Sequence, residues 1–192
     1  KITEMNRWHA LVPIKQGGNG KSRLAEILSQ AERDLLSLRM ARHVLFELGR
    51  CSSISDITVL STDRPDWWSG SWAADGGQGL NAEIERWRQT CDGPAVLIVH
   101  ADLPLLDAAD VRNLLDVAEA EGIALATDRV GEGSNALAIA DGRPFELRFG
   151  PDSMRLHAAQ SPAMRVIKCT GLSVDIDTLD DLMFARAHGF TG

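Results

Sequence analysis

The stretch Val96-Leu97-Ile98-Val99 is apolar at every position and leads directly into His100-Ala101-Asp102. A strand buried on both faces of a sheet lacks polar alternation, so this run predicts a central strand over 95–100. A sheet covered on both faces needs helices on both sides, which is the α/β arrangement. Ligands in such folds bind beyond the carboxyl ends of the strands, and this places Asp102 where a site is expected.

Apolar stretches alternate with helical patterns on both sides of this central strand. Further strands are predicted at 10–14, 57–61, 123–127, 136–140, 164–169 and 172–175. Helices are predicted from a capping box at Ser29 to about Gly49, from Asp107 to Glu121, and from Thr178 to Gly189. We therefore expect one α/β domain over 1–192, with a mostly parallel mixed sheet flanked by helices. Residues 1–8 are expected to form an N-terminal extension.

The composition argues against several classes of protein. Of the 192 residues, 44% are hydrophobic and 24% charged, as is ordinary for a soluble globular domain. A net charge of −7 argues against a nucleic-acid-binding surface, and no apolar run approaches the ~20 residues of a membrane span. The three cysteines are widely spaced, which indicates free thiols in a reducing compartment, so we expect a cytoplasmic protein.

A glycine-rich loop with basic residues follows the first predicted strand. It reads Lys15-Gln16-Gly17-Gly18-Asn19-Gly20-Lys21-Ser22-Arg23. Glycines allow the backbone to approach a phosphate closely, and free amides at a helix start attract the anion. The end of the loop satisfies the P-loop pattern GxxxxGK[ST], but Lys15 stands where the first glycine is required. A phosphate-binding loop, a P-loop NTPase or kinase, and a solvated loop with incidental lysines all stay open at this point.

Three aspartates fall at predicted strand ends, namely Asp102, Asp175 and Asp177. Residues two apart on a strand share one face, so Asp175 and Asp177 can converge on one site. Carboxylates suit Mg²⁺, which completes its shell with water and phosphate oxygens. The alternatives are a turn at Asp102 and a helix start at Asp175 and Asp177. Together with the basic loop, the three carboxylates favour a metal–nucleotide site.

Three further polar loops can present backbone amides and polar side chains to a ligand. They are 76–81 with Gly79 and Asn81, 131–135 with Gly133 and Ser134, and 149–153 with Gly150 and Ser153. Such loops hold phosphates, carboxylates or nucleotides, but ordinary turns have the same composition. Trp67, Trp68 and Trp72 lie in another loop, which we expect to pack on the domain rather than to bind a partner.

In their order and spacing, these segments resemble the 2-phospho-L-lactate guanylyltransferase family, which makes the activated precursor of the deazaflavin coenzyme F(420). The resemblance runs from Leu11 to about Leu182. It rests on the motifs at 12–15, 21–25, 79–81, 101–106, 133–137, 149–153 with His157, and 175–178. It implies a nucleotide-diphospho-sugar-transferase-like fold and transfer of GMP from GTP, with release of pyrophosphate. The acceptor would be 2-phospho-L-lactate, phosphoenolpyruvate or 3-phospho-D-glycerate.

The resemblance also implies roles for the candidate residues. Mg²⁺ would be held by Asp102, Asp175 and Asp177. The nucleotide would be bound by Lys15, Lys21, Gly79, Asn81 and Asp102, and the acceptor by Gly133, Ser134, Gly150 and Ser153. The catalytic residues would be Lys21, Arg23 and Asp102. Ser134 stands where the family usually has Thr. The partners are then GTP and a small phospho-acid, without nucleic acid or membrane, and the sequence is compatible with a homodimer. A non-catalytic GTP-binding module with the same residues is the second alternative.

Overall fold

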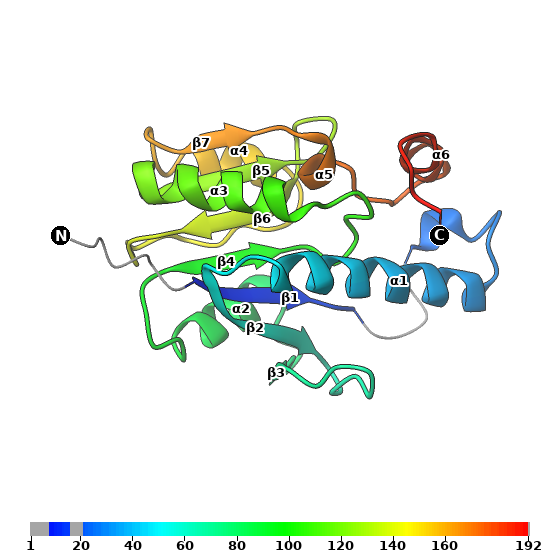
Figure 1. Cartoon of the computed structure of the whole chain (residues 1–192), viewed down its shortest axis with the longest axis horizontal. Helices are drawn as coiled ribbons and strands as arrows, with labels where there is room; N and C mark the ends of the chain where they lie inside the picture. The colour runs from blue at the N-terminus through cyan, green and yellow to red at the C-terminus, as the bar shows by residue number, and fades with distance from the viewer. Residues whose placement is uncertain (1–7, 16–20, 192) are drawn as a thin grey trace.

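A 7-stranded sheet in the order β3-β2-β1-β4-β6-β5-β7 organises the protein, shown here by a computed structural model that describes residues 8–15 and 21–191 (Figure 1). The strands are β1 (Trp8–Pro13), β2 (Ile54–Ser61), β3 (Ser71–Ala74), β4 (Val96–Val99), β5 (Ile123–Thr127), β6 (Ser134–Ile139) and β7 (Arg165–Ile167). Only β6 runs antiparallel to its neighbours, β4 and β5, and the other pairs are parallel. The predicted mostly parallel mixed sheet is confirmed.

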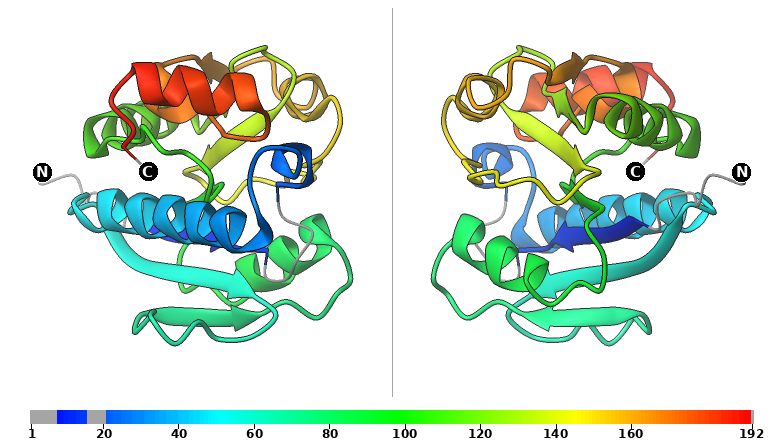
Figure 2. Two further views of the ribbon diagram at one scale, coloured as in Figure 1. Left: turned by 90° about the vertical axis from the view of Figure 1, so that its right-hand side faces the viewer. Right: turned by 90° about the vertical axis from the view of Figure 1, so that its left-hand side faces the viewer.

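Helices cover both faces of this sheet. They are η1 (Ser22–Leu24), α1 (Gln30–Gly49), α2 (Leu80–Arg88), α3 (Ala108–Glu121), α4 (Ser153–Ala158), α5 (Thr170–Ser173) and α6 (Leu179–Ala187). The core beneath α1, α3 and α5 includes Leu97 and Val99, whereas the core beneath α2 and α4 includes Val96 and Ile98. The two views of Figure 2 show α1 and α3 on one side of the sheet and α2 and α4 on the other. The wholly apolar central strand is thus explained by burial on both faces.

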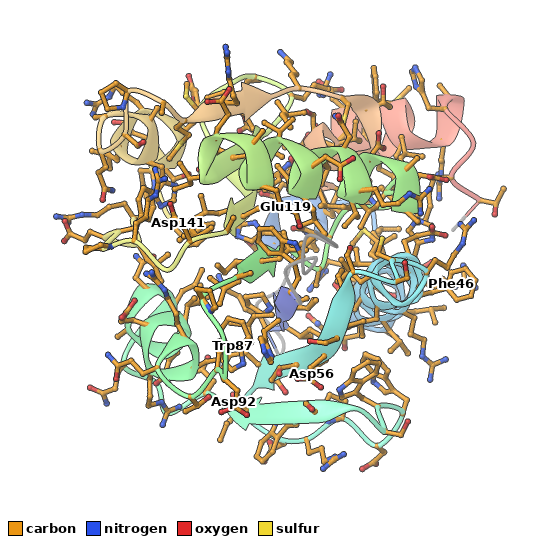
Figure 3. All side chains as sticks on the ribbon, turned by 60° about the vertical axis from the view of Figure 1, so that its left-hand side comes forward. Phe46, Asp56, Trp87, Asp92, Glu119 and Asp141 are labelled. Atoms are coloured by element: carbon orange, nitrogen blue, oxygen red, sulfur yellow. The ribbon has the colours of Figure 1, made fainter. Side chains whose placement is uncertain are left out.

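Side-chain burial follows this layering. Trp87 of α2 is 6% exposed, whereas Phe46 of α1 is 65% exposed, and Figure 3 shows them on opposite sides of the sheet.

None of the described helices is both long enough and apolar enough to cross a lipid bilayer.

The predicted helix starts are confirmed by their caps. The Ser29 and Thr178 side chains each accept a hydrogen bond from the backbone three residues on, and each completes a capping box. Asp107 caps α3 by accepting from Ala109 N–H. After α6, Gly189 has φ 102°, as predicted for a glycine that ends a helix.

Two predictions about elements are wrong, and one strand was missed. The predicted strand at 172–175 is instead the end of α5 followed by chain that pairs with no strand. The prediction failed because a short buried helix and a short buried strand give apolar runs of similar length. Trp8, assigned to the N-terminal extension, begins β1 and is wholly buried; residues 1–7 lie outside the described residues. The missed strand is β3, which carries Trp72 and is an outermost strand of the sheet. The tryptophans at 67, 68 and 72 pack against the core, as predicted.

The topology brings the candidate loops to one edge of the sheet. Six of the strands are parallel to one another and end at this edge, because β6 alone is reversed. The reversed strand begins where β5 ends, with Ser134 paired to Thr127. The residues after β1, β3, β4, β5 and β7 therefore lie on the same side of the molecule as the start of β6.

Candidate active site

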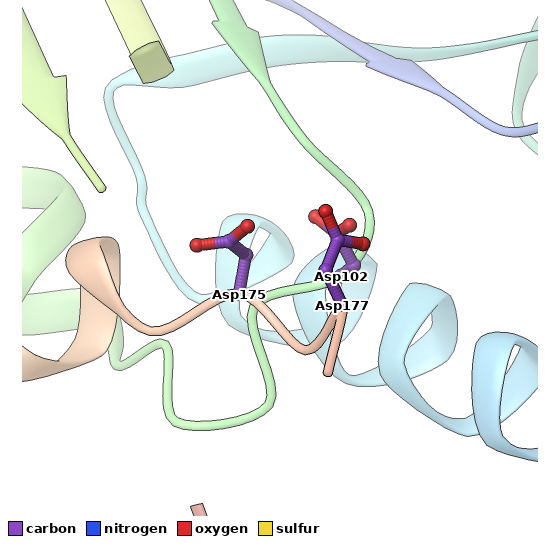
Figure 4. A group of neighbouring side chains, drawn as sticks. All are labelled: Asp102, Asp175 and Asp177. Atoms are coloured by element: carbon purple, nitrogen blue, oxygen red, sulfur yellow. The ribbon is translucent and has the colours of Figure 1, made fainter. Parts of the chain in front are cut away.

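Three carboxylates meet at this edge (Figure 4). Asp102 follows β4, and Asp175 and Asp177 lie on the extended segment between α5 and α6. One oxygen of each lies within 4.8 Å of those of the other two. The backbone N–H of Ile176 donates to the carbonyl of Asp102 at 3.3 Å, which joins the two segments. The predicted convergence of this carboxylate cluster is confirmed, although Asp175 and Asp177 do not end a strand of the sheet.

Lys21 lies between two members of the carboxylate cluster. Its Nζ is 2.5 Å from Asp102 Oδ2 and 3.0 Å from Asp177 Oδ1. Burial lowers the pKa of Lys21, but the two carboxylates outweigh it and hold the pKa above its ordinary value. The Lys21 backbone adopts φ 55°, in the left-handed region that few residues other than glycine occupy. The fold thus accepts a strained residue to place this ammonium among the carboxylates.

The charges of the carboxylate cluster are incompletely balanced. Burial raises the pKa of Asp102, but Lys21 and His100 lower this pKa by more than burial raises it. The carboxyl is therefore ionised. Its Oδ1 is buried and has no hydrogen-bond partner among the described residues. Burial, followed by repulsion from Asp102, raises the pKa of Asp175 to about 6. An all-oxygen donor set with an unpartnered oxygen and excess negative charge fits a hard divalent cation such as Mg²⁺.

The two predicted acceptor loops are joined to each other. Met154 N–H of α4 donates to Glu132 O at 3.0 Å, and the buried His157 of α4 bonds Ser134 Oγ at 2.9 Å. Ser153, the first residue of α4, is also buried. A side chain at position 133 would place its Cβ 2.9 Å from Asp128 Oδ2, so the Asp128 carboxylate would have to shift to admit one.

Asn81 has a contact that the sequence did not predict. Its Nδ2 donates to Phe149 O at 3.0 Å, and its Oδ1 accepts from Phe149 N–H at 2.8 Å. The side chain thereby fixes the segment that leads to Gly150. Gly79, with φ 94°, caps the start of α2 next to this contact. Both residues lie at the expected edge, but the amide of Asn81 is already hydrogen-bonded to the backbone of Phe149.

The basic loop is described only in part. Lys15 and Arg23 are exposed at its two ends, and 16–20, including the predicted Gly17–Gly20 turn, lies outside the described residues. Lys15 is near enough to affect the pKa of His100. Of the basic residues predicted for the nucleotide, the structure shows Lys21 in contact with the carboxylate cluster.

The chain matches a known protein family over nearly its whole length, since residues 8–191 match the family described as "Guanylyl transferase CofC like". The chain belongs to this family. It is 33% identical to a phosphoenolpyruvate guanylyltransferase from Sphaerobacter thermophilus, over 95% of this chain and 94% of the relative. It is 35% identical to a protein of the same name from Roseiflexus castenholzii, over 95% and 90%. The predicted guanylyltransferase resemblance is confirmed, and the protein is a nucleotidyltransferase.

Solved structures support the fold of this CofC-like chain. A putative nucleotide-diphospho-sugar transferase from Desulfovibrio desulfuricans G20 superimposes with a TM-score of 0.79 at 17% identity, over 98% of this chain and 90% of that one. A nucleotidyl transferase from Methanothermobacter thermautotroptrophicus gives 0.64 at 18% identity, over 95% and 97%. The predicted nucleotide-diphospho-sugar-transferase-like fold is confirmed.

The P-loop alternative does not describe this CofC-like protein. A P-loop leads directly into a long helix, with its lysine directed at phosphate. Here Lys21 precedes the 3-residue η1, and its ammonium bonds two carboxylates.

Two candidate functional residues of this guanylyl transferase were not predicted from the sequence. Asn135 is buried, and its Nδ2 donates to Leu172 O at 3.1 Å and to Asp175 Oδ1 at 3.2 Å, which orients that carboxylate. His100 contacts the ring of Phe149, and its Nε2 is buried without a hydrogen-bond partner among the described residues. Burial keeps the pKa of His100 low despite Asp102. Asn135 is a buried polar residue within β6, and His100 directly follows the apolar β4, and a polar residue next to apolar strand residues was the available signal.

Proposed function

We propose that this protein transfers GMP from GTP to a small phosphorylated carboxylic acid and releases pyrophosphate. The observation that carries the proposal is the carboxylate cluster with Lys21 beside the acceptor loops, in a chain of the CofC-like guanylyl transferase family. Relatives named phosphoenolpyruvate guanylyltransferase make phosphoenolpyruvate the first acceptor to test. 2-Phospho-L-lactate and 3-phospho-D-glycerate are the other acceptors in this proposal.

In this proposal Asp102, Asp175 and Asp177 would hold Mg²⁺, which would supply positive charge to the triphosphate. Asn135 orients Asp175, as its 3.2 Å contact supports. Lys15, Lys21 and Arg23 provide the protein's own positive charge to the phosphates. Gly79 and Asn81 border the nucleotide, with Asn81 acting through Phe149.

The reaction joins two polyanions, so positioning and charge neutralisation are the main requirements. A phosphate oxygen of the acceptor attacks the α-phosphorus of GTP. The new oxygen–phosphorus bond forms as the bond from the α-phosphorus to the bridging oxygen breaks, and pyrophosphate leaves with the electron pair. The second pKa of a phosphate is ~6, so the nucleophile is already anionic near neutral pH and needs no general base. Gly133, Ser134, Gly150 and Ser153 hold the acceptor.

The decisive experiment is a pyrophosphate-release screen. The purified protein with Mg²⁺ is supplied with GTP or ATP, each combined with phosphoenolpyruvate, 2-phospho-L-lactate, 2-phosphoglycerate or 3-phosphoglycerate. We expect release with GTP and at least one phospho-acid, together with a product whose mass equals their GMP adduct. Formation of GDP and inorganic phosphate without an acceptor would indicate an NTPase. GTP binding without turnover on any acid would indicate a non-catalytic module.

We also propose a cytoplasmic location, without nucleic-acid or membrane partners, and a homodimer as the assembly to test by sedimentation. The free thiols of Cys51, Cys91 and Cys169 agree with a reducing compartment.

A further inference from the structure

His157 is wholly buried on α4, and both of its ring nitrogens have partners. The backbone nitrogen of Arg148 lies 2.8 Å from Nε2, and Ser134 Oγ lies 2.9 Å from Nδ1. A backbone N–H can only donate, so Nε2 must be the unprotonated, accepting nitrogen. A neutral imidazole then carries its proton on Nδ1, which donates to Ser134 Oγ.

The surroundings of His157 favour this neutral form. The rings of Phe145 and Phe149 lie with their centroids 5.5 and 5.0 Å from the imidazole. Burial, together with His100, lowers the pKa of His157 to about 4. Protonation would also place a hydrogen on Nε2 facing the N–H of Arg148. The same tautomer therefore persists across the neutral pH range.

The direction of the Ser134 hydroxyl follows from this tautomer. Since Nδ1–H donates to the oxygen, the hydroxyl hydrogen cannot point at His157. Within 8–15 and 21–191, the structure gives Ser134 Oγ no acceptor for that hydrogen. Ser134 begins β6 at the edge of the sheet where the carboxylate cluster lies, with its hydroxyl on the side of α4, whereas Asn135 bonds Leu172 of α5.

We propose that His157 is a positioning residue that fixes Ser134 as a hydrogen-bond donor to an oxyanion of the acceptor. The inference rests on the proposed function, because it takes Ser134 to contact the acceptor. It goes further in stating which kind of atom Ser134 meets: a phosphate or carboxylate oxygen. Ser134 then recognises the anionic group that the acceptors share, and discrimination between a methyl, a methylene and a hydroxyl falls to other residues.

Two substitutions separate the two hydrogen bonds of His157. His157→Asn keeps a donor near the Nδ1 position and loses the acceptor for Arg148. His157→Gln keeps an acceptor near the Nε2 position and loses the donor to Ser134. With saturating GTP and the most active phospho-acid, we expect His157→Gln to raise the acceptor KM about tenfold, as for a lost hydrogen bond to a charged group, with an unchanged KM for GTP. His157→Asn should stay within about twofold of wild type, since its donor is retained.

A double-mutant cycle tests whether His157 acts through Ser134. Ser134→Ala alone should raise the acceptor KM about as much, and the double variant Ser134→Ala/His157→Gln should be no worse than Ser134→Ala. If the two effects multiply, or if His157→Gln raises the KM for GTP equally, His157 is only structural. If Ser134→Ala leaves the acceptor KM unchanged while turnover continues, the inference fails and the proposed reaction stands.

The tautomer can be tested without turnover. Long-range ¹H–¹⁵N spectra of the full chain should show His157 with a protonated Nδ1 and an unprotonated Nε2 from pH 5 to 8. The opposite tautomer, or a protonated ring at pH 7, overturns the inference even if the enzyme is active. If the wild-type protein releases no pyrophosphate with any phospho-acid, the proposed function fails, and with it the role assigned to Ser134.

Discussion

The carboxylate cluster and the histidine network, by which we mean Ser134, His157, Arg148 N–H, Phe149 and Asn81, lie at the same edge of the sheet but are built differently. In the carboxylate cluster, Asp102 Oδ1 has no partner among the described residues, and the pKa of Asp175 is raised to about 6. In the histidine network, both nitrogens of His157 and both ends of the Asn81 amide are hydrogen-bonded. The first region keeps unbalanced charge, which the proposed Mg²⁺ would neutralise, whereas the second is uncharged and leaves the Ser134 hydroxyl hydrogen to be donated to a ligand.

This difference indicates how the site divides its work. Unbalanced buried charge is costly to folding and is retained where a ligand neutralises it. An uncharged hydrogen-bonded network instead holds its members in one geometry, as the recognition of a small acceptor requires. The cluster should therefore respond most to changes in charge, and the network to loss of a single hydrogen bond.

Asp102→Asn is expected to have the largest effect, because it removes an ionised carboxylate that pairs with Lys21 and that would bind the proposed cation. Pyrophosphate release should fall at least about 10³-fold at saturating Mg²⁺, and Mn²⁺ binding followed by electron paramagnetic resonance should weaken in parallel. Asp180→Asn, an exposed change outside the cluster on α6, is the matched control and should retain activity. Wild-type turnover in Asp102→Asn would contradict the metal assignment.

His157→Gln should change how stability depends on pH. The folded pKa of about 4 lies below the unfolded value of about 6.5, so the unfolded state binds the proton more tightly. The stabilisation from the neutral ring is fully present above about pH 6.5 and is lost as the pH falls toward 4. Urea denaturation should show the wild type losing up to about 3 kcal/mol more than His157→Gln between pH 7.5 and 4. His100 is the titratable neighbour of the ring, so a His100→Gln background controls for it; equal losses in both proteins would contradict a neutral buried imidazole.

The sequence predicted the α/β fold and the position of Asp102 for clear physical reasons. A wholly apolar strand implies burial on both faces, and the carboxyl ends of parallel strands share an edge, so the pattern of residues alone places Asp102 at that edge. Ser29, Asp107 and Thr178 were correctly identified as caps because capping depends on local sequence alone.

What the sequence could not predict depends on contacts between distant segments. The bonds from Asn81 to Phe149 and from Ser134 to His157 join segments 68 and 23 residues apart. Lys21 was predicted to meet phosphate because a basic residue in a glycine-rich loop favours that ligand, but its pairing with Asp102 and Asp177 depends on how the loop folds back. The strand predicted at 172–175 failed because a short apolar run does not distinguish a strand from a short buried helix.

Lys21→Met should sharpen the comparison by removing the cation that the protein itself places in the carboxylate cluster. Without nucleotide, Mn²⁺ should bind about tenfold more tightly than to wild type, because the ammonium no longer competes for Asp102 and Asp177. Turnover should fall at the same time, since Lys21 is also proposed to act on the triphosphate. Arg23→Met is the control for metal binding, because the exposed Arg23 has no contact with the cluster among the described residues. Unchanged or weaker Mn²⁺ binding in Lys21→Met would show that Lys21 does not compete with the metal.

Asp175→Asn should have the smallest effect on stability, and its sign is the informative result. Burial, followed by repulsion from Asp102, raises the folded pKa of Asp175 to about 6, above the unfolded value of about 3.9. The folded state therefore binds this proton more tightly, and the metal-free protein loses stability as the pH rises from about 4 to about 6. In EDTA at pH 7.5, Asp175→Asn should raise the free energy of unfolding by about 1 kcal/mol, a value reduced for partial solvent screening.

The same substitution should also lower pyrophosphate release, so it would stabilise the protein while making it less active. At pH 4 the stability difference from wild type should disappear, since the wild-type carboxyl is then protonated in the folded state. Asn135→Ala provides the matched comparison, because it removes the 3.2 Å bond to Asp175 without removing the charge, and it should destabilise the protein at both pH values. If Asp175→Asn instead destabilises the metal-free protein at pH 7.5, groups within the chain already balance the charge on Asp175. The carboxylate cluster would then not differ from the histidine network in having unbalanced charge.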